Sequence, residues 1–132
     1  MTDAERAWLE LTTPSDRRHV GRRGQVTYPF RQYGQAVAWI EWQPGRAIIL
    51  KLETLGGKGE GAKLIRALIQ IADQHGIRIT GNASPYATPE RPAPTPSPEQ
   101  LCDYYRSLGF EVGPPPFFVI SYPPAKERAG NG

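Results

Sequence analysis

The residues of this sequence best suited to chemistry lie in a glycine-rich segment, the glycine loop, between an apolar run and an amphipathic run. It reads Leu55-Gly56-Gly57-Lys58-Gly59-Glu60-Gly61-Ala62. Glycine adopts positive φ angles and lets the backbone approach a ligand closely, and the N-terminus of a following helix offers N–H groups at the positive end of its dipole. The pattern indicates a cradle for phosphate groups, although glycines that only end a strand and begin a helix would look the same.

Two familiar phosphate loops do not fit this segment. In a Walker A loop, a lysine followed by Ser or Thr comes directly after the last glycine, whereas Gly61 is followed by Ala62 and Lys63. In a Rossmann loop, an acidic residue ends the next strand about 20 residues further on, where this chain has Thr80-Gly81-Asn82. The sequence therefore argues against both a nucleoside-triphosphate P-loop and a dinucleotide site.

A tyrosine-containing motif lies downstream of the glycine loop. From Tyr104 to Glu111 the chain reads Tyr-Tyr-Arg-Ser-Leu-Gly-Phe-Glu. Together the two motifs resemble those of the GNAT N-acetyltransferase superfamily, which pairs a loop of the form Arg/Gln-x-x-Gly-x-Gly/Ala with a later Tyr-x-x-Leu-Gly-Phe-like segment. Gly59-Glu60-Gly61 and residues 105–110 occupy these places, and the resemblance extends over residues 47–113, about half of the chain.

The resemblance implies an α/β (α+β) fold: a mixed, mostly antiparallel sheet flanked by helices, with strands that splay around the acetyl-CoA site. It implies acetyl-CoA as the co-substrate and no metal. The diphosphate would be held by residues of the glycine loop, namely Gly57, Lys58, Gly59, Glu60, Gly61 and Ala62. Because Gly56 stands where the family has Arg or Gln, backbone N–H groups would carry most of the binding, with positive charge from Lys58.

Enzymes of this family move the acetyl group directly to a primary amine in a ternary complex, which requires three groups. An acceptor ammonium with a pKa of about 10.4 must lose a proton, and Glu53 is the expected base. The backbone of Leu52 to Thr54 is expected to stabilise the oxyanion. Tyr105 matches the family position that protonates the departing thiolate, and Asn82 matches the one that contacts the pantetheine arm.

Each of these side-chain roles has a structural alternative. Glu53 could face solvent or pair with a cation. Tyr105 could be a core aromatic residue, because Leu101, Tyr105 and Leu108 share one helix face. Tyr104, about 100° around that helix, is then the neighbouring choice for the proton donor.

The elements that must position these residues follow from periodicity and turn signals. The sequence predicts helices at 4–11, from the glycine loop to Gly76, and at 98–108, and strands at 26–30, 36–42, 47–55, 77–80 and 117–122. The strand at 47–55 is expected to be central and buried. Because a helix connects the strands at 47–55 and 77–80, a right-handed crossover should leave them parallel.

Composition indicates one cytoplasmic domain. With 132 residues, 39% of them hydrophobic, the chain can form one core. We expect a domain over 1–124, with a short helix and basic segment at 1–24 and a proline-rich loop at 85–98, and then a flexible tail at 125–132. The single Cys102 forms no intramolecular disulfide, and no apolar run approaches the roughly 20 residues of a membrane span.

The possible partners of the chain follow from its arginines and prolines. Five arginines lie between Arg17 and Arg31, with Asp16 as their only close acidic neighbour. This arginine cluster could bind nucleic acid, cofactor phosphates or an acidic protein, or it could be only a solvated loop. The proline-rich loop could be a spacer, a ligand for a partner or a wall over the active site.

Two functions follow from these observations. The first is acetyl transfer to a primary amine, which is either a protein lysine or a small amine. The second is a non-catalytic module of the same fold that binds a protein or nucleic acid through the arginine cluster or the proline-rich loop.

Overall fold

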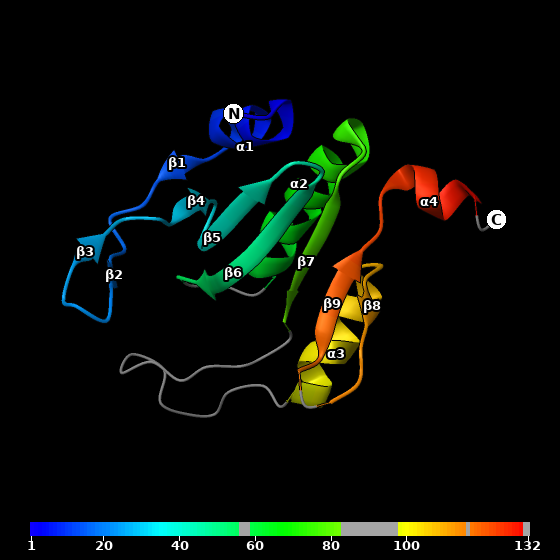
Figure 1. Ribbon diagram of the computed structural model, residues 1–132. Helices are drawn as coiled ribbons and strands as arrows, with labels where there is room; N and C mark the ends of the chain where they lie inside the picture. The colour runs from blue at the N-terminus through cyan, green and yellow to red at the C-terminus, as the bar shows by residue number, and fades with distance from the viewer. Residues whose placement is uncertain (56–58, 83–97, 116, 131–132) are drawn as a thin grey trace.

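The computed structural model describes residues 1–55, 59–82, 98–115 and 117–130 and is shown in Figure 1. In this part of the chain, seven strands form one sheet in the order β1-β4-β5-β6-β7-β9-β8. Every neighbouring pair is antiparallel except β6 and β7, which are parallel. The expected mixed, mostly antiparallel α+β fold is therefore confirmed, as is the parallel pair. The bounds of the strands are β1 Thr13–Pro14, β4 Arg31–Tyr33, β5 Ala36–Gln43, β6 Arg46–Thr54, β7 Arg78–Asn82, β8 Glu111–Val112 and β9 Val119–Tyr122.

Four helices and a separate hairpin complete the described structure. The helices are α1 Asp3–Leu11, α2 Glu60–His75, α3 Pro98–Ser107 and α4 Ala125–Gly130. The hairpin consists of β2 His19–Val20 and β3 Val26–Thr27, which pair only with each other among the described strands. Figure 1 shows α2 along one face of the sheet and the β2–β3 hairpin extending away from the sheet.

The apolar stripe of α2 forms the core against the sheet. Its residues Leu64, Ile65 and Leu68 are fully buried, and burial of each such side chain contributes about 1.5–3 kcal/mol. The helix ends at Gly76, whose φ of 65° lies in the left-handed region that glycine adopts without strain. Both the helix and its end lie where the sequence predicts them.

A β-bulge interrupts the hairpin of β5 and β6. Trp39 lies opposite Lys51 and Ile40 lies opposite Ile49, so Leu50 is an extra residue on β6. Leu50 is 44% exposed, whereas Ile49 is buried. The prediction that the whole strand at 47–55 is buried is therefore wrong at Leu50, which follows the inward-facing Ile49 and turns to the other face of the sheet, and at Leu55, which is 48% exposed.

Helix α4 stands where the sequence predicts a flexible tail. The Glu127 N–H donates to the Pro124 oxygen at 3.0 Å in its first turn. The Glu127 carboxylate pairs with Arg78, and another guanidinium nitrogen of Arg78 donates to the Ser121 hydroxyl at 2.7 Å. The local sequence does not reveal this partner, because Arg78 lies on β7 and is itself held by Ser121 of β9.

Some of the expected features lie outside the described residues. These are the proline-rich loop at 85–98, apart from Pro98 at the start of α3, and the loop residues Gly56, Gly57 and Lys58. Within the described ranges, no helix is long and apolar enough to cross a membrane. The same ranges contain no group of three or more His, Cys, Asp and Glu residues that could hold a metal ion.

Candidate functional site

Strands β6 and β7 separate toward the beginning of α2. Their pairing covers residues 46–49 of β6 and 78–81 of β7, and β6 continues to Thr54. At its far end β7 instead pairs with β9, where Asn82 lies opposite Val119. Figure 1 shows the two strands side by side at one end and apart at the other. The expected splay of the strands is therefore confirmed.

The backbone of β6 directs two amides, those of Leu52 and Thr54, toward the region where β6 and β7 separate. The Leu55 N–H donates to the Gln35 oxygen at 2.7 Å, on the β5 side. Successive N–H groups of a strand point to opposite edges, so the Glu53 N–H also turns toward β5, and the N–H groups of Leu52 and Thr54 turn toward β7. Leu52, one of the residues expected to stabilise the oxyanion, is thus oriented to donate between the two strands.

Helix α2 begins without a side-chain cap. Its N-cap residue is Gly59, which has a φ of 78° and makes no side-chain hydrogen bond. A left-handed φ requires glycine here, and glycine has no side chain that could bind the first N–H groups of the helix. The N–H groups of Glu60, Gly61 and Ala62 therefore present the positive end of the helix dipole to an anion.

The Glu60 side chain ties the β4–β5 turn to α2. Its Oε2 accepts the Gln35 N–H at 3.1 Å, and its Oε1 accepts from the Lys63 Nζ at 3.1 Å. The hydrogen bond from Gln35 and then the bond from Lys63 lower the pKa of the Glu60 carboxyl. Because the carboxylate is already engaged, any contribution of Glu60 to phosphate binding comes from its backbone N–H.

Gly61 packs closely against β6 and α3. A Cβ at this position would lie 3.4 Å from the Thr54 Cγ2, 3.7 Å from the Tyr104 hydroxyl and 3.9 Å from the Leu52 Cδ2. A methyl group fits at these distances, but a larger side chain would displace its neighbours. The first turn of α2, the end of β6 and Tyr104 therefore meet at one place.

Tyr105 lies in the core rather than at this meeting point. It is 6% exposed, and its ring contacts those of Phe110 at 5.4 Å and Tyr104 at 5.3 Å between centroids. Burial, with a smaller effect of Tyr104, raises the pKa of Tyr105 to about 12. Burial also raises the pKa of the half-buried Tyr104. The hydroxyl near the first turn of α2 is thus that of Tyr104, which the sequence offered as the alternative proton donor to Tyr105.

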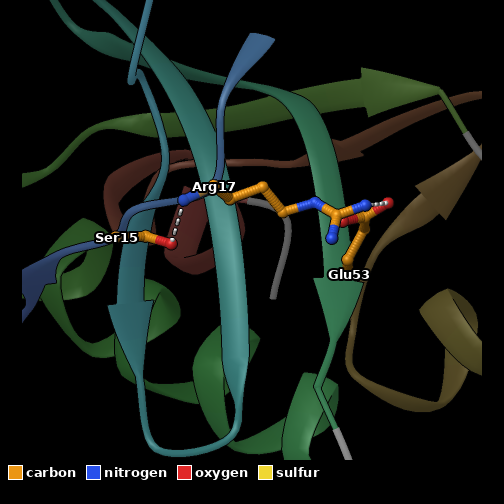
Figure 2. A network of polar contacts seen from close by, with 3 residues as sticks. All are labelled: Ser15, Arg17 and Glu53. Carbon is orange, nitrogen blue, oxygen red and sulfur yellow. Dashed lines mark hydrogen bonds and ion pairs between the residues drawn. The ribbon is translucent and has the colours of Figure 1, made fainter.

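Glu53 is bound by Arg17, as Figure 2 shows. The Arg17 Nη2 donates to the Glu53 Oε1 at 3.0 Å, and the Arg17 Nε forms an ion pair with the Glu53 Oε2. The Arg17 N–H donates to the Ser15 Oγ at 3.1 Å, which holds the start of this segment. The Glu53 side chain is only 12% exposed. Sequence reasoning missed Arg17 as a partner, and its only signal was membership of the arginine cluster.

Glu53 and Leu52 serve opposite faces of the sheet. Leu52 and Thr54 lie beside Gly61 on the α2 face, so Glu53 between them turns to the other face. Trp39 occupies that second face too, since it lies opposite Lys51 across the hairpin.

Asn82 lies at the separated end of β7. Its Nδ2 donates to the Phe117 oxygen at 2.9 Å, and the residue is exposed. Its position suits the pantetheine contact that the family resemblance implies, but its amide N–H₂ already holds the segment before β9.

The protein is therefore an α+β protein with a seven-stranded mixed sheet. Among the described strands, β6 and β7 form the one parallel pair, and the sheet opens between them. Among solved structures, the chain is similar to the anti-CRISPR protein AcrVA5, with a TM-score of 0.55 and 20% sequence identity over 69% of this chain and 93% of that chain. At this identity the likeness establishes the fold. No protein-family model matches the sequence, and no curated protein matches it significantly.

Proposed function

We propose that the protein is a GNAT-type N-acetyltransferase that moves the acetyl group of acetyl-CoA to a primary amine. The observation that carries the proposal is the coincidence of three features at one place. There β6 separates from β7, the Leu52 N–H turns toward β7, and α2 begins at Gly59 without a side-chain cap. An anion and a carbonyl oxygen of one extended ligand would both find donors there.

The residues present fit acetyl-CoA. The N–H groups of residues 60–62 would bind the diphosphate, and the small Gly61 lets the start of α2 lie close to the end of β6. Bound acetyl-CoA would supply an activated acetyl group and a thiolate leaving group. Gly57, Lys58 and Asn82 remain part of the proposed binding set.

Three groups of the chain would handle the charges of the transfer. The amine nitrogen attacks the thioester carbon, its proton passes to Glu53 directly or through water, and the Leu52 N–H binds the carbonyl oxygen. Tyr105 would then protonate the departing sulfur, so the products would be an amide and the CoA thiol, and proton exchange with solvent would return Tyr105 and Glu53 to their starting states. Its raised pKa, about 12, keeps this phenol protonated at neutral pH. Arg17 would position the Glu53 carboxylate.

A non-catalytic module remains the second candidate, because one observation favours it. The Glu53 carboxylate is already bound by a guanidinium. This ion pair would account for the low exposure of Glu53 without any catalytic role.

Calorimetric titration with acetyl-CoA tests the proposal on the wild type and on two variants of one glycine. Gly61→Ala should retain affinity, because a Cβ there makes ordinary van der Waals contacts. Gly61→Trp should abolish binding, because the ring would displace Tyr104 and the end of β6. A wild-type chain that does not bind acetyl-CoA rejects the enzyme.

Turnover separates the enzyme from the module. With acetyl-CoA and a primary amine, mass spectrometry should detect the acetylated amine, and Glu53→Gln should lower the rate by about 10²–10⁴-fold. Binding of acetyl-CoA without any acetylated product would favour the module.

A further inference from the structure

The β2–β3 hairpin is a surface element that the proposed chemistry does not use. It closes with a tight turn, in which the Gly21 N–H donates to the Gln25 oxygen at 2.8 Å and the Gly24 N–H donates to the Gly21 oxygen at 3.0 Å. Figure 1 shows that it stands away from the seven-stranded sheet. Hydrogen bonds within the hairpin therefore fix its turn, and the seven-stranded sheet does not cover it.

The base of the hairpin is fixed beside Glu53. The His19 ring on β2 lies 4.7 Å from the Trp39 ring, and Phe30 contacts the same ring at 6.2 Å between centroids. Trp39 and Glu53 share one sheet face, and Arg17, just before β2, binds Glu53. A molecule seated on the hairpin would consequently lie next to the proposed base.

The structure divides the arginine cluster into two sets. Arg17 is bound to Glu53, and Arg31 donates to the Leu9 oxygen at 2.9 Å and to the Thr12 oxygen at 2.7 Å, where it holds the end of α1. Arg18, Arg22 and Arg23 are exposed, and no ion pair among the described residues includes them. The chain has no acidic residue from Arg17 to Ile40. The positive charge of the hairpin is thus uncompensated locally.

Exposed apolar and aromatic side chains lie near these arginines in the chain. Val20 is 58% exposed, Val26 46% and Tyr28 63%. Arginine and tyrosine are enriched at protein interfaces, where apolar contacts supply affinity and charged groups supply specificity. The surface therefore suits a partner that is both acidic and apolar.

We propose that the β2–β3 hairpin is a docking arm for an acceptor protein, and that it selects lysines flanked by acidic and apolar residues. This inference rests on the proposed function, because the position of the hairpin beside Glu53 matters only if Glu53 takes part in acetyl transfer. A nucleic acid would match the charge equally well, but it would bring no aliphatic primary amine to Glu53. For this reason a protein is the partner that the position of the hairpin favours.

Fluorescence anisotropy tests docking independently of catalysis. The probe is a labelled peptide in which one lysine is flanked by glutamates and leucines, and its control has glutamines in place of the glutamates. The wild type should bind the acidic peptide at least about tenfold more tightly, and added salt should reduce the difference. Equal binding of both peptides, or no binding, overturns the proposal.

Variants identify the surface. Arg22→Glu with Arg23→Glu should remove the preference for the acidic peptide, whereas Arg22→Lys with Arg23→Lys should retain most of it. Arg6→Glu with Lys126→Glu makes the same change in net charge at exposed positions of α1 and α4 and should retain the preference. Thermal melting checks that each variant is folded. A preference that survives in the Arg22→Glu, Arg23→Glu protein, or is lost equally in the α1 and α4 control, contradicts the assignment.

Two further measurements separate this inference from its alternatives. If a labelled DNA oligonucleotide binds the wild type and the Arg22→Glu, Arg23→Glu protein loses it, while neither peptide binds, the hairpin belongs to nucleic acid and the proposal fails. Failure of the wild type to bind acetyl-CoA would reject the proposed function alone, since peptide binding is measured without it.

Discussion

Tyr104 and Tyr105 are neighbours on α3 but lie in different surroundings. The Tyr104 hydroxyl is near the first turn of α2, whereas the Tyr105 ring packs against Phe110. A proton donor to the leaving sulfur must reach the place where β6 and β7 separate. Under the proposed function, the resemblance of residues 105–110 to the family motif favours Tyr105 for this role, and the closeness of the Tyr104 hydroxyl to Gly61 favours Tyr104.

Single hydroxyl deletions distinguish the two tyrosines. We expect Tyr105→Phe to slow turnover by about 10–10³-fold and to leave the affinity for acetyl-CoA nearly unchanged, because the phenyl ring preserves the packing. Tyr104→Phe is the matched control and should change turnover little. Steady-state kinetics and calorimetry measure both quantities. The opposite ranking of the two variants would transfer the donor role to Tyr104.

For single residues, the sequence points to candidate side chains but does not predict which groups they contact. The end of the central strand points to Glu53 and a motif position points to Tyr105, but the partner of Glu53 lies 36 positions away in the chain. Periodicity and turn signals concern near neighbours, so they contain no information about such a pair. The same holds for the contact of Tyr104 with the start of α2.

Among the elements, predictability follows length. The helices α1 and α2 and the strands β5, β6 and β7 have enough residues to display a period, and Gly76 marks the end of α2. β1, β2 and β8 have two residues each and exist only because a partner strand pairs with them. Helix α4 has six residues, too few to display a period, and its partner Arg78 lies far away in the chain.

Removal of α4 tests how much this element contributes. A chain ending at Pro124 loses the ion pair of Glu127 with Arg78, which is largely exposed and worth about 0–1 kcal/mol. We expect the melting temperature to fall by a few degrees. Differential scanning calorimetry measures the change, and Glu127→Gln in the full chain isolates the ion pair. Loss of cooperative melting would show instead that α4 is required for the fold.

At the scale of the whole molecule, the two faces of the sheet carry different groups of the candidate site. The uncapped start of α2, with Gly61, lies on one face, and Glu53 with the base of the hairpin lies on the other. Under the proposed function, the co-substrate and the acceptor would therefore approach from different sides and meet between β6 and β7.

Global stability should fall in alkaline solution because of Tyr105. In the unfolded chain this phenol loses its proton near pH 10, whereas its pKa in the folded protein is about 12. The contribution of Tyr105 to the free energy of unfolding is complete below about pH 10. It is lost as the pH rises toward 12, because the unfolded state then binds fewer protons than the folded state. The shift of about two units corresponds to at most about 2–3 kcal/mol.

Urea unfolding at about pH 8 and about pH 11 measures this loss. The wild type should lose more free energy of unfolding between these values than Tyr105→Phe does. Tyr28→Phe, at a position that is 63% exposed, should behave as the wild type. An equal loss in the wild type and Tyr105→Phe would contradict the buried state of this phenol.

The extra residue on β6, Leu50, determines which face of the sheet each later side chain of the strand occupies. Ala47 and Ile49 face the core before the bulge, and Leu52 and Thr54 share that face after it. In an uninterrupted strand the odd positions would continue inward, and Glu53 would point into the core. Loss of one residue at the bulge would therefore exchange the two faces of everything that follows, whereas substitution of the exposed side chain there would not. During evolution, substitution of Leu50 should therefore be tolerated far more readily than deletion of one residue from β6.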